Sequence, residues 1–439
     1  MSEKYSSNGD AIDRRLGRAL TAFEARHPKS LEFHQFAARY MPGGNTRTVI
    51  WHEPFPLRIV SGDGPMLTDA DGFEYVDFLG EYTAGLFGHS HPVIRRATRE
   101  ALDGGLSFGA HNQYEVRFSQ LLCERFRNLE SLRFTNSGTE ANLMAISASR
   151  AFAGRSKVMV FRGGYHGGVF YFGAHNSPLN APFPWLIAPY NDLETAQGML
   201  QRDGGEIACV LVEPMQGSAG CIPAHKAFLR GLREACDKAG VLLIFDEVMT
   251  SRLGAGGAGE MYGVKPDLMT LGKYLGGGFS FGAFGGRQDI MARFDPSRAD
   301  PWVHPGTFQN NVMTMRAGVA VLEEIYTSEA ADAHFQYGEN YRERLNRSLE
   351  RAGAGFRACG LGSLMNLHPT TSVVADISAL QGLDDRLRLL LFLGLLERGY
   401  YIARRGFLSL SLMLEDGHLD GFESALLEVL SEPDQAADR

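Results

Sequence analysis

A single lysine, Lys273, lies in the otherwise small and apolar stretch "TLGKYLGGGF" at residues 270–279. The residues before it are typical of a buried strand, and the glycines after it let another group approach the backbone closely. A P-loop is excluded because Asp267 stands where that motif requires glycine, and Tyr274 stands where it requires serine or threonine. A solvated surface lysine is the plain alternative. A partly desolvated lysine, however, has a lowered pKa and forms Schiff bases with carbonyl groups.

Asp246 is a second candidate, because it ends the apolar run in "VLLIFDEV" at residues 241–248. A carboxylate at the end of a buried strand is costly unless a cation or hydrogen-bond donors meet it. One interpretation pairs Asp246 or Glu247 with an arginine such as Arg252. The other interpretation is that Asp246 keeps the nitrogen of a heterocyclic ring protonated.

An anion site is indicated by "NSGTEAN" at residues 136–142, where a strand gives way to a glycine turn and then to a helix. The free backbone N–H groups and the helix dipole at Ser137, Gly138 and Thr139 are suited to a phosphate. A helix cap would explain the same residues, because serine or threonine followed by glutamate resembles a capping box. Tyr165, in "GGYHGG", adds an aromatic ring after another apolar run.

Five short apolar runs position these side chains, and a polar or glycine turn and a helical pattern follow each run. The runs are "LRF", "KVMVF", "ACVLV", "VLLIF" and "LMTL". Repeated strand, turn and helix predict an α/β fold with a mostly parallel sheet between two layers of helices. Ligands of such sheets bind at the carboxyl ends of the strands, where we expect these side chains to meet. The match of "GAGGAG" at residues 254–259 to a dinucleotide-binding motif follows no apolar strand, and we predict a flexible loop there.

The pattern divides the chain into a large domain and a smaller one. Apolar residues at helical spacing predict a helix at residues 11–26, and short alternating runs with D-G turns predict antiparallel strands after it. We predict that residues 1–75 form an N-terminal helix and arm belonging to the small domain. Residues 76–310 are predicted to be the large domain, and residues 311–439 the C-terminal small α+β domain.

Composition narrows the function classes. The chain has 439 residues, a formal net charge of −8 and no dense basic stripe, so a nucleic-acid partner is not expected. Its five cysteines are scattered without a C-x-x-C pair, which argues against a metal site and favours a reducing compartment. No apolar stretch reaches the roughly 20 residues of a membrane span, and no signal peptide is recognised at the N-terminus. A cytoplasmic protein is expected.

These candidates together match the needs of one cofactor, pyridoxal 5′-phosphate (PLP). Its phosphate would bind at the turn of residues 137–139, and its ring would stack on Tyr165. Asp246 would keep the pyridine nitrogen protonated, and Lys273 would hold the aldehyde.

The sequence also resembles the class III aminotransferases, which are fold-type I PLP enzymes, from about residue 38 to about residue 425. The motifs that carry the resemblance are "NSGTEAN", "GGYHG", "VEPMQG", "FDEVMTSR", "TLGKYLGGG", "GAFGGR" and "HPGTFQNN". Within the family, "YMPGGNTRTV", "EYTAGLFGHS" and "RRGFLSLSL" are similar to aminotransferases of aromatic β-amino acids such as β-phenylalanine. Glutamate-1-semialdehyde aminomutase is a further relative. The resemblance implies a large, mostly parallel seven-stranded sheet domain and a smaller α+β domain.

The resemblance also implies roles for residues around the cofactor. Val248 would pack on the ring face opposite Tyr165, and Glu213 would lie near the cofactor. Met249 stands where many relatives carry glutamine, so one hydrogen bond to the cofactor's phenolic oxygen is expected to be missing. Thr307 would reach the phosphate from the neighbouring subunit of a homodimer, whose active sites are shared between subunits.

Substrate contacts are implied in the same way. Arg47 matches the arginine that receives the substrate carboxylate in the β-amino-acid enzymes. Arg405 matches a C-terminal arginine that switches between an acceptor carboxylate and an apolar side chain, and Glu81 is expected to be its partner.

Three functions remain open at this point. The first is transfer of an amino group from a β-amino acid to a keto acid such as 2-oxoglutarate or pyruvate. The second is isomerisation of the aminomutase type, although "GGNTR" and "TSR" depart from the aminomutase pattern. The third is a PLP-independent oxidoreductase that uses a nicotinamide.

Overall fold

The computed structural model describes residues 11–173 and 175–432. Its centre is a seven-stranded sheet in which only β12 runs antiparallel to its neighbours. In spatial order the strands are β4 (Ser131–Thr135), β12 (Gly282–Gly286), β11 (Leu268–Gly272), β10 (Leu242–Asp246), β7 (Ile207–Val212), β5 (Lys157–Phe161) and β6 (Trp185–Ala188). The predicted mostly parallel sheet of a fold-type I enzyme is confirmed, and all five apolar runs form strands in it.

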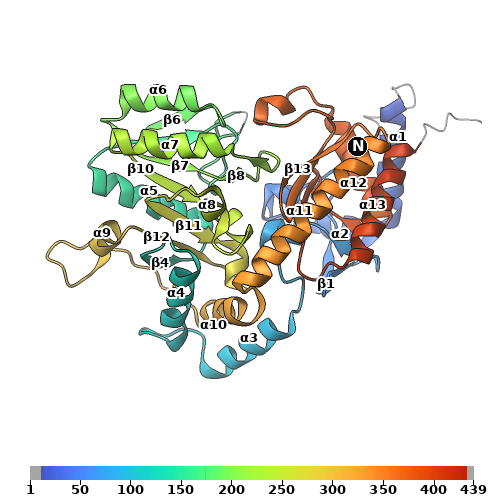
Figure 1. The fold of residues 1–439 in the computed structure, drawn as a ribbon. Coiled ribbons are helices and arrows are strands. Elements are labelled where there is room, and N and C mark those ends of the chain that lie inside the picture. The colour runs from blue at the N-terminus through green and yellow to red at the C-terminus, as the bar shows by residue number, and fades with distance from the viewer. Residues whose placement is uncertain (1–10, 174, 433–439) are drawn as a thin grey trace, which may run out of the picture.

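Helices cover both faces of this sheet (Figure 1). The helices around the sheet are α4 (Gln113–Arg125), α5 (Gly138–Ala153), α6 (Leu193–Asp203), α7 (Lys226–Ala239), α8 (Gly257–Tyr262), α9 (Gln288–Met291) and α10 (Val312–Ala320). The helix α3 (Pro92–Gly104) packs against α10. A short hairpin of β8 (Met215–Gln216) and β9 (Ile222–Pro223) lies beside them.

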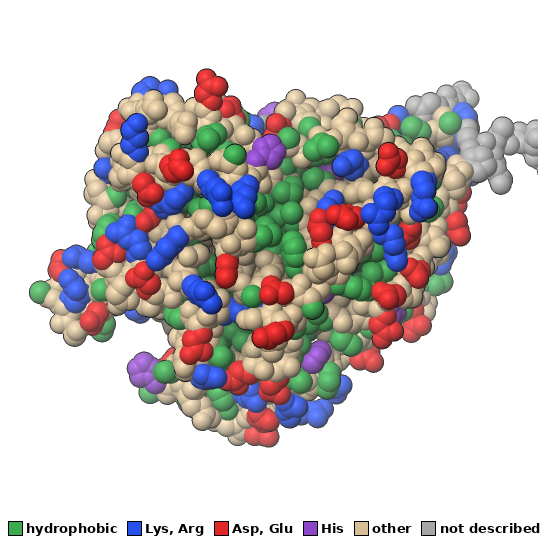
Figure 2. Space-filling model, in the orientation of Figure 1, with side chains coloured by type: hydrophobic (Ala, Val, Ile, Leu, Met, Phe, Trp, Pro, Cys, Tyr) green, Lys and Arg blue, Asp and Glu red, His purple; other side chains and the backbone are tan. Residues whose placement is uncertain are grey.

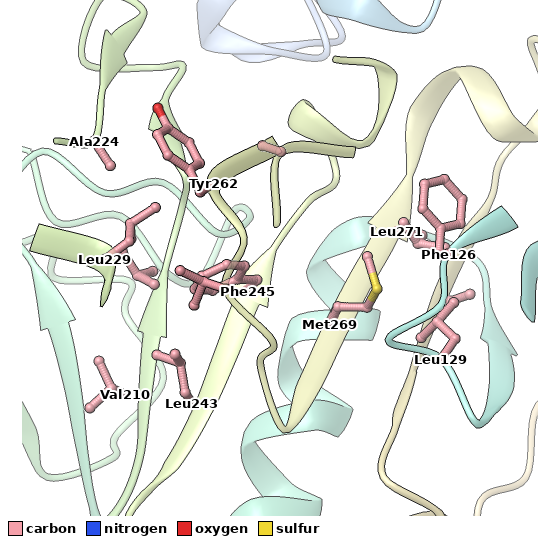
Figure 3. Close-up of a cluster of buried hydrophobic side chains, with 14 of the residues drawn as sticks. Phe126, Leu129, Val210, Ala224, Leu229, Leu243, Phe245, Tyr262, Met269 and Leu271 are labelled. Carbon is pink, nitrogen blue, oxygen red and sulfur yellow. The ribbon is translucent and has the colours of Figure 1, made fainter. Parts of the chain in front are cut away.

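Alternate residues of the central strands point to opposite faces, as the two-residue period of a strand requires. Leu243 and Phe245 of β10 join a cluster with Leu229 of α7, and Figure 3 shows them together with Val210 and Tyr262. Ile244, between them in the sequence, joins the cluster on the other face, which α5 and α9 cover. Because both faces are buried, the strands are continuously apolar, which is the pattern that predicted them.

The two ends of the chain form a second core. The helix predicted at residues 11–26 is confirmed as α1 (Ala11–Arg26), which packs beside α12 (Asp385–Glu397). The predicted antiparallel strands are β1 (Ile59–Asp63), β2 (Met66–Asp69) and β3 (Glu74–Asp77), and β15 (Tyr400–Tyr401) adds to this sheet in parallel with β3. The remaining elements of this region are α2 (Pro28–Ala37), α11 (Ser328–Arg351), β13 (Arg357–Leu361), β14 (Leu364–His368), β16 (Phe407–Ser409) and α13 (Asp416–Ser431).

Figure 2 shows hydrophobic side chains gathered along the middle of one face, with acidic and basic side chains mixed on either side. Met315 and Tyr326 belong to the core of the large sheet, although the predicted small domain begins at residue 311. The segment that packs into the core of the large sheet therefore extends past the predicted boundary at residue 310.

In the described part of the chain, no helix is long and apolar enough to span a membrane.

The prediction of a flexible loop at residues 254–259 is wrong in part. Residues 257–259 begin the short buried helix α8, and the N–H groups of Ala258 and Gly259 each donate to the Glu247 carboxylate at 2.8 Å. A carboxylate buried after β10 supplies acceptors that hold this glycine-rich segment in place, a contact that local composition does not disclose.

Candidate active site

A cavity of about 560 Å³ opens at the carboxyl ends of the central strands. Every predicted site residue except Thr307 lines it, including residues from both ends of the chain such as Arg47 and Arg405. Thr307 lines a separate groove with His111 and Arg133. Thr307 is predicted to contact the phosphate bound by the neighbouring subunit, so we expect it to lie away from the cavity of its own chain. This role of Thr307 stays a prediction.

The anion site is the N-terminus of α5. Ser137 is the N-cap, and its hydroxyl accepts from the N–H of Glu140 at 3.2 Å, so the capping interpretation is right for this side chain. The N–H groups of Gly138 and Thr139, the first helical residues, have no partner within the helix by geometry. A Cβ on Gly138 would lie only 2.8 Å from Cγ2 of Val248, so glycine is the residue that lets this turn and Val248 approach one another.

Asp246 is buried and fully engaged in hydrogen bonds. Its Oδ2 accepts from Nδ2 of Asn142 and from the ring of His166, each at 2.8 Å. Its Oδ1 accepts from the N–H of Val248 at 3.1 Å. Donors on both oxygens stabilise the ionised carboxylate and fix its direction.

Arg252 is not the partner of Asp246 or Glu247. Its buried guanidinium donates to the Ser409 hydroxyl at 2.9 Å and to the carbonyl of Leu410. The first interpretation of Asp246 is therefore wrong as far as Arg252 is concerned.

Two further residues, not predicted from the sequence, complete this network. Asn142 holds both Asp246 and the carbonyl of His166, and the hydroxyl of Thr270 donates to its Oδ1 at 2.9 Å. A signal for Asn142 was present, because it lies one helical turn after Gly138 in "NSGTEAN" and so faces the same edge of the sheet.

Glu213 braces the loop that carries Tyr165. One carboxylate oxygen accepts from the N–H of Tyr165 at 3.0 Å, and the other accepts from the N–H of Gly217 at 3.1 Å. Burial raises the pKa of Glu213 to about 7, the negative charge of Asp246 adds to the rise, and His166 opposes it. A carboxyl group that holds its proton more tightly than an exposed glutamate thus lies within the cavity.

Lys273 begins the turn that follows β11, with its side chain partly buried in the cavity. Burial lowers the pKa of its amine, and the nearby charge of Asp246 opposes this effect. Its backbone has a φ of 53°, in the left-handed region that non-glycine residues rarely adopt. Strained backbone of this kind concentrates at functional sites, where the surrounding structure holds it.

The two predicted substrate arginines differ in their partners. Arg47 donates to Oε1 of Glu81 at 2.6 Å. Arg405 lies over the rings of Tyr82 and Phe407, at 5.5 Å and 5.4 Å from their centroids. Glu81 is thus paired with Arg47 and not with Arg405, the partner predicted from the sequence.

The chain matches known proteins over nearly its whole length. The sequence profile described as aminotransferase class-III matches residues 49–368. A β-phenylalanine transaminase of Variovorax paradoxus is 52% identical over 416 residues, which cover 95% of this chain and 96% of that protein. A solved structure of a β-phenylalanine aminotransferase from that organism has a TM-score of 0.94, with 52% identity, and covers 95% of this chain and 97% of that one. A glutamate-1-semialdehyde 2,1-aminomutase of Salinibacter ruber is 37% identical over 396 residues, or 85% of this chain and 89% of that protein.

The cavity fits the cofactor of that family. It offers free N–H groups and hydroxyls at the start of α5, a carboxylate held by donors on both oxygens, and an amine whose pKa burial has lowered. No potential metal cluster of three or more ligating side chains is found in residues 11–173 and 175–432. The chain belongs to the class III aminotransferases and is a transaminase that depends on pyridoxal 5′-phosphate.

Proposed function

We propose that this enzyme transfers the amino group of a β-amino acid, aromatic in type such as β-phenylalanine, to a keto acid such as 2-oxoglutarate or pyruvate. The observation that carries the proposal is the position of Arg47, which lines the same cavity as Lys273 and is held there by Glu81. A guanidinium binds a carboxylate in a fixed, two-pronged geometry, so it measures the distance from the substrate's carboxylate to its amine. The name of the Variovorax relative supports the same substrate class.

The residues of the cavity then take these roles. Ser137, Gly138 and Thr139 would hold the cofactor phosphate, and Tyr165 and Val248 would pack on its ring. Asp246 would keep the ring nitrogen protonated, and Met249 would add an apolar contact. Glu213 fixes the loop of Tyr165.

Lys273 is the group that moves the proton. When bound, PLP supplies an electron sink for the pair left on the substrate carbon after deprotonation. The uncharged Nζ of Lys273 would take a proton from the carbon that bears the amino group, and the same amine would then give that proton back. Burial favours this neutral form of the amine, because the charged form loses its hydration.

Arg405 serves the acceptor. Its guanidinium lies against aromatic rings, and no carboxylate among the residues that the structure describes pairs with it. It is therefore available to the second carboxylate of a keto acid such as 2-oxoglutarate. We further propose a cytoplasmic homodimer in which Thr307 of each subunit approaches the phosphate bound by the other. A division into domains at residue 75 is part of the same proposal, and the large domain is proposed to extend past residue 310 to Tyr326, which packs in its core.

A panel of α-, β- and ω-amino acids, each with 2-oxoglutarate or pyruvate, tests the proposal. We expect β-amino acids, and aromatic ones above all, to react fastest, and Arg47→Ala to raise the KM for them. Exclusive reaction of α-amino acids would exclude the β-amino-acid assignment. Isomerisation of glutamate-1-semialdehyde without any keto acid would favour the aminomutase instead.

A further inference from the structure

Four consecutive residues before the first helix of the large sheet region have left-handed backbone. Gly80, Glu81, Tyr82 and Thr83 have φ values of 54°, 47°, 51° and 83°. Residues other than glycine rarely adopt this region even singly, because Cβ crowds the following carbonyl group. A run of three such residues needs compensation from its surroundings, and strain of this kind concentrates at sites where it positions functional groups.

The turn points two neighbouring side chains at the two arginines of the cavity. Glu81 accepts from Arg47 at 2.6 Å, while the ring of Tyr82 lies 5.5 Å from Cζ of Arg405. The hydroxyl of Tyr82 donates to the carbonyl of Val49 at 2.6 Å. One short turn thus connects the N-terminal segment of Arg47 with the C-terminal segment of Arg405.

Arg405 depends on aromatic rings for its position. The rings of Tyr82 and Phe407 are stacked, with their planes 18° apart and their centroids 6.0 Å apart, and Arg405 contacts both. In residues 11–173 and 175–432, no carboxylate lies within ion-pair distance of its guanidinium, and its Nε has no hydrogen-bond partner. A cation over ring faces is held by the ring quadrupole while its N–H groups remain free for an incoming anion.

We propose that Tyr82 is a specificity-determining residue, whose ring holds Arg405 ready for the distal carboxylate of a dicarboxylic keto acid. This inference rests on the acceptor role given to Arg405 above. Tyr82 favours dicarboxylic over monocarboxylic acceptors because only a dicarboxylate reaches Arg405 after its first carboxylate is bound. The same ring faces offer an apolar surface to an aromatic side chain when no second carboxylate is present.

Steady-state kinetics of three variants test the proposal, with 2-oxoglutarate and pyruvate as acceptors. Tyr82→Leu removes the ring but keeps an apolar side chain, and Tyr82→Phe keeps the ring but removes the bond to Val49. Tyr114→Leu is the control, because Tyr114 lies under Arg316, 5.7 Å from its Cζ, outside the cavity. Tyr82→Met replaces Tyr82→Leu if the latter fails to fold, as judged by thermal unfolding.

We expect Tyr82→Leu to raise the KM for 2-oxoglutarate by about tenfold, the factor for loss of a partly desolvated cation–π contact, while the KM for pyruvate stays unchanged. Tyr82→Phe is expected to stay near the wild type for both acceptors. Equal rises for both acceptors, or a Tyr82→Phe variant that behaves like Tyr82→Leu, would overturn the proposal.

Binding of glutarate, an unreactive dicarboxylate, separates this inference from the proposed function. By calorimetry, Tyr82→Leu is expected to weaken glutarate about tenfold and butyrate not at all. If the wild type transfers no amino group from β-amino acids, the substrate proposal fails, while glutarate binding still decides the role of Tyr82. Unchanged glutarate affinity in Tyr82→Leu refutes that role.

Discussion

Gly138 offers the sharpest test of how the cofactor site is built, through the substitution Gly138→Ala. The added Cβ would lie 2.8 Å from Cγ2 and 2.9 Å from Cγ1 of Val248. Carbon atoms in contact sit about 3.5–4.0 Å apart, so Val248 must move by roughly 0.7 Å or the start of α5 must shift. Overpacking of this size costs about 1–3 kcal/mol. Gly138 is predicted to bind the phosphate and Val248 to pack on the ring, so both movements disturb the bound cofactor.

We therefore expect Gly138→Ala to weaken the affinity for PLP by roughly tenfold, because about 1.4 kcal/mol corresponds to that factor. The assay removes the cofactor by dialysis and follows visible absorbance as PLP is added back. Gly198→Ala, in the middle of α6, is the matched control, because its Cβ meets no atom within 4 Å. It is expected to leave the affinity unchanged and to stabilise the helix by about 1 kcal/mol. Wild-type affinity in Gly138→Ala would refute the steric argument.

Two further predictions concern the lysine and a buried acid. Lys273→Ala is expected to abolish transamination without unfolding the protein, whereas Lys265→Ala, at an exposed lysine, retains it; undiminished turnover in Lys273→Ala would remove its assigned role. Burial raises the pKa of Glu247 from 4.5 to about 7, so between these pH values the folded state binds the proton more tightly than the unfolded chain does. Stability should thus fall by up to roughly 3 kcal/mol as the pH rises through this range. Urea unfolding from pH 4.5 to 8 should show a shallower decline in Glu247→Gln than in the exposed control Glu194→Gln, and equal slopes would contradict the assignment.

Much of the fold and of the cofactor site could be predicted from the sequence. The strand β10 was recognisable because both of its faces are buried, which makes its sequence continuously apolar and leaves Asp246 at its end. The carboxyl ends of parallel strands meet at one edge, so Lys273 at the end of β11 had to come close to Asp246. The local sequence pattern and this general rule of sheet topology were together sufficient to predict that Asp246 and Lys273 lie close together.

The partners of individual charged side chains could not be predicted from the sequence in the same way. Arg252 bonds to residues near position 410, and Glu81 bonds to Arg47 and not to Arg405. The left-handed turn at residues 80–83 decides the second pairing, because it sets the directions in which Glu81 and Tyr82 point. "GEYT" contains only one residue that favours this backbone, so the sequence carried little sign of it.

The sequence by itself determined the class of fold, the cofactor and the edge of the sheet where chemistry occurs, because these follow from strand period, helix starts and residue types at strand ends. Only the tertiary structure decided that segments from both ends of the chain meet over the cavity. It also decided which arginine Glu81 contacts and which arginine Tyr82 contacts. Such contacts join residues far apart in the chain, such as Tyr82 and Arg405, and their geometry depends on how all the intervening elements pack.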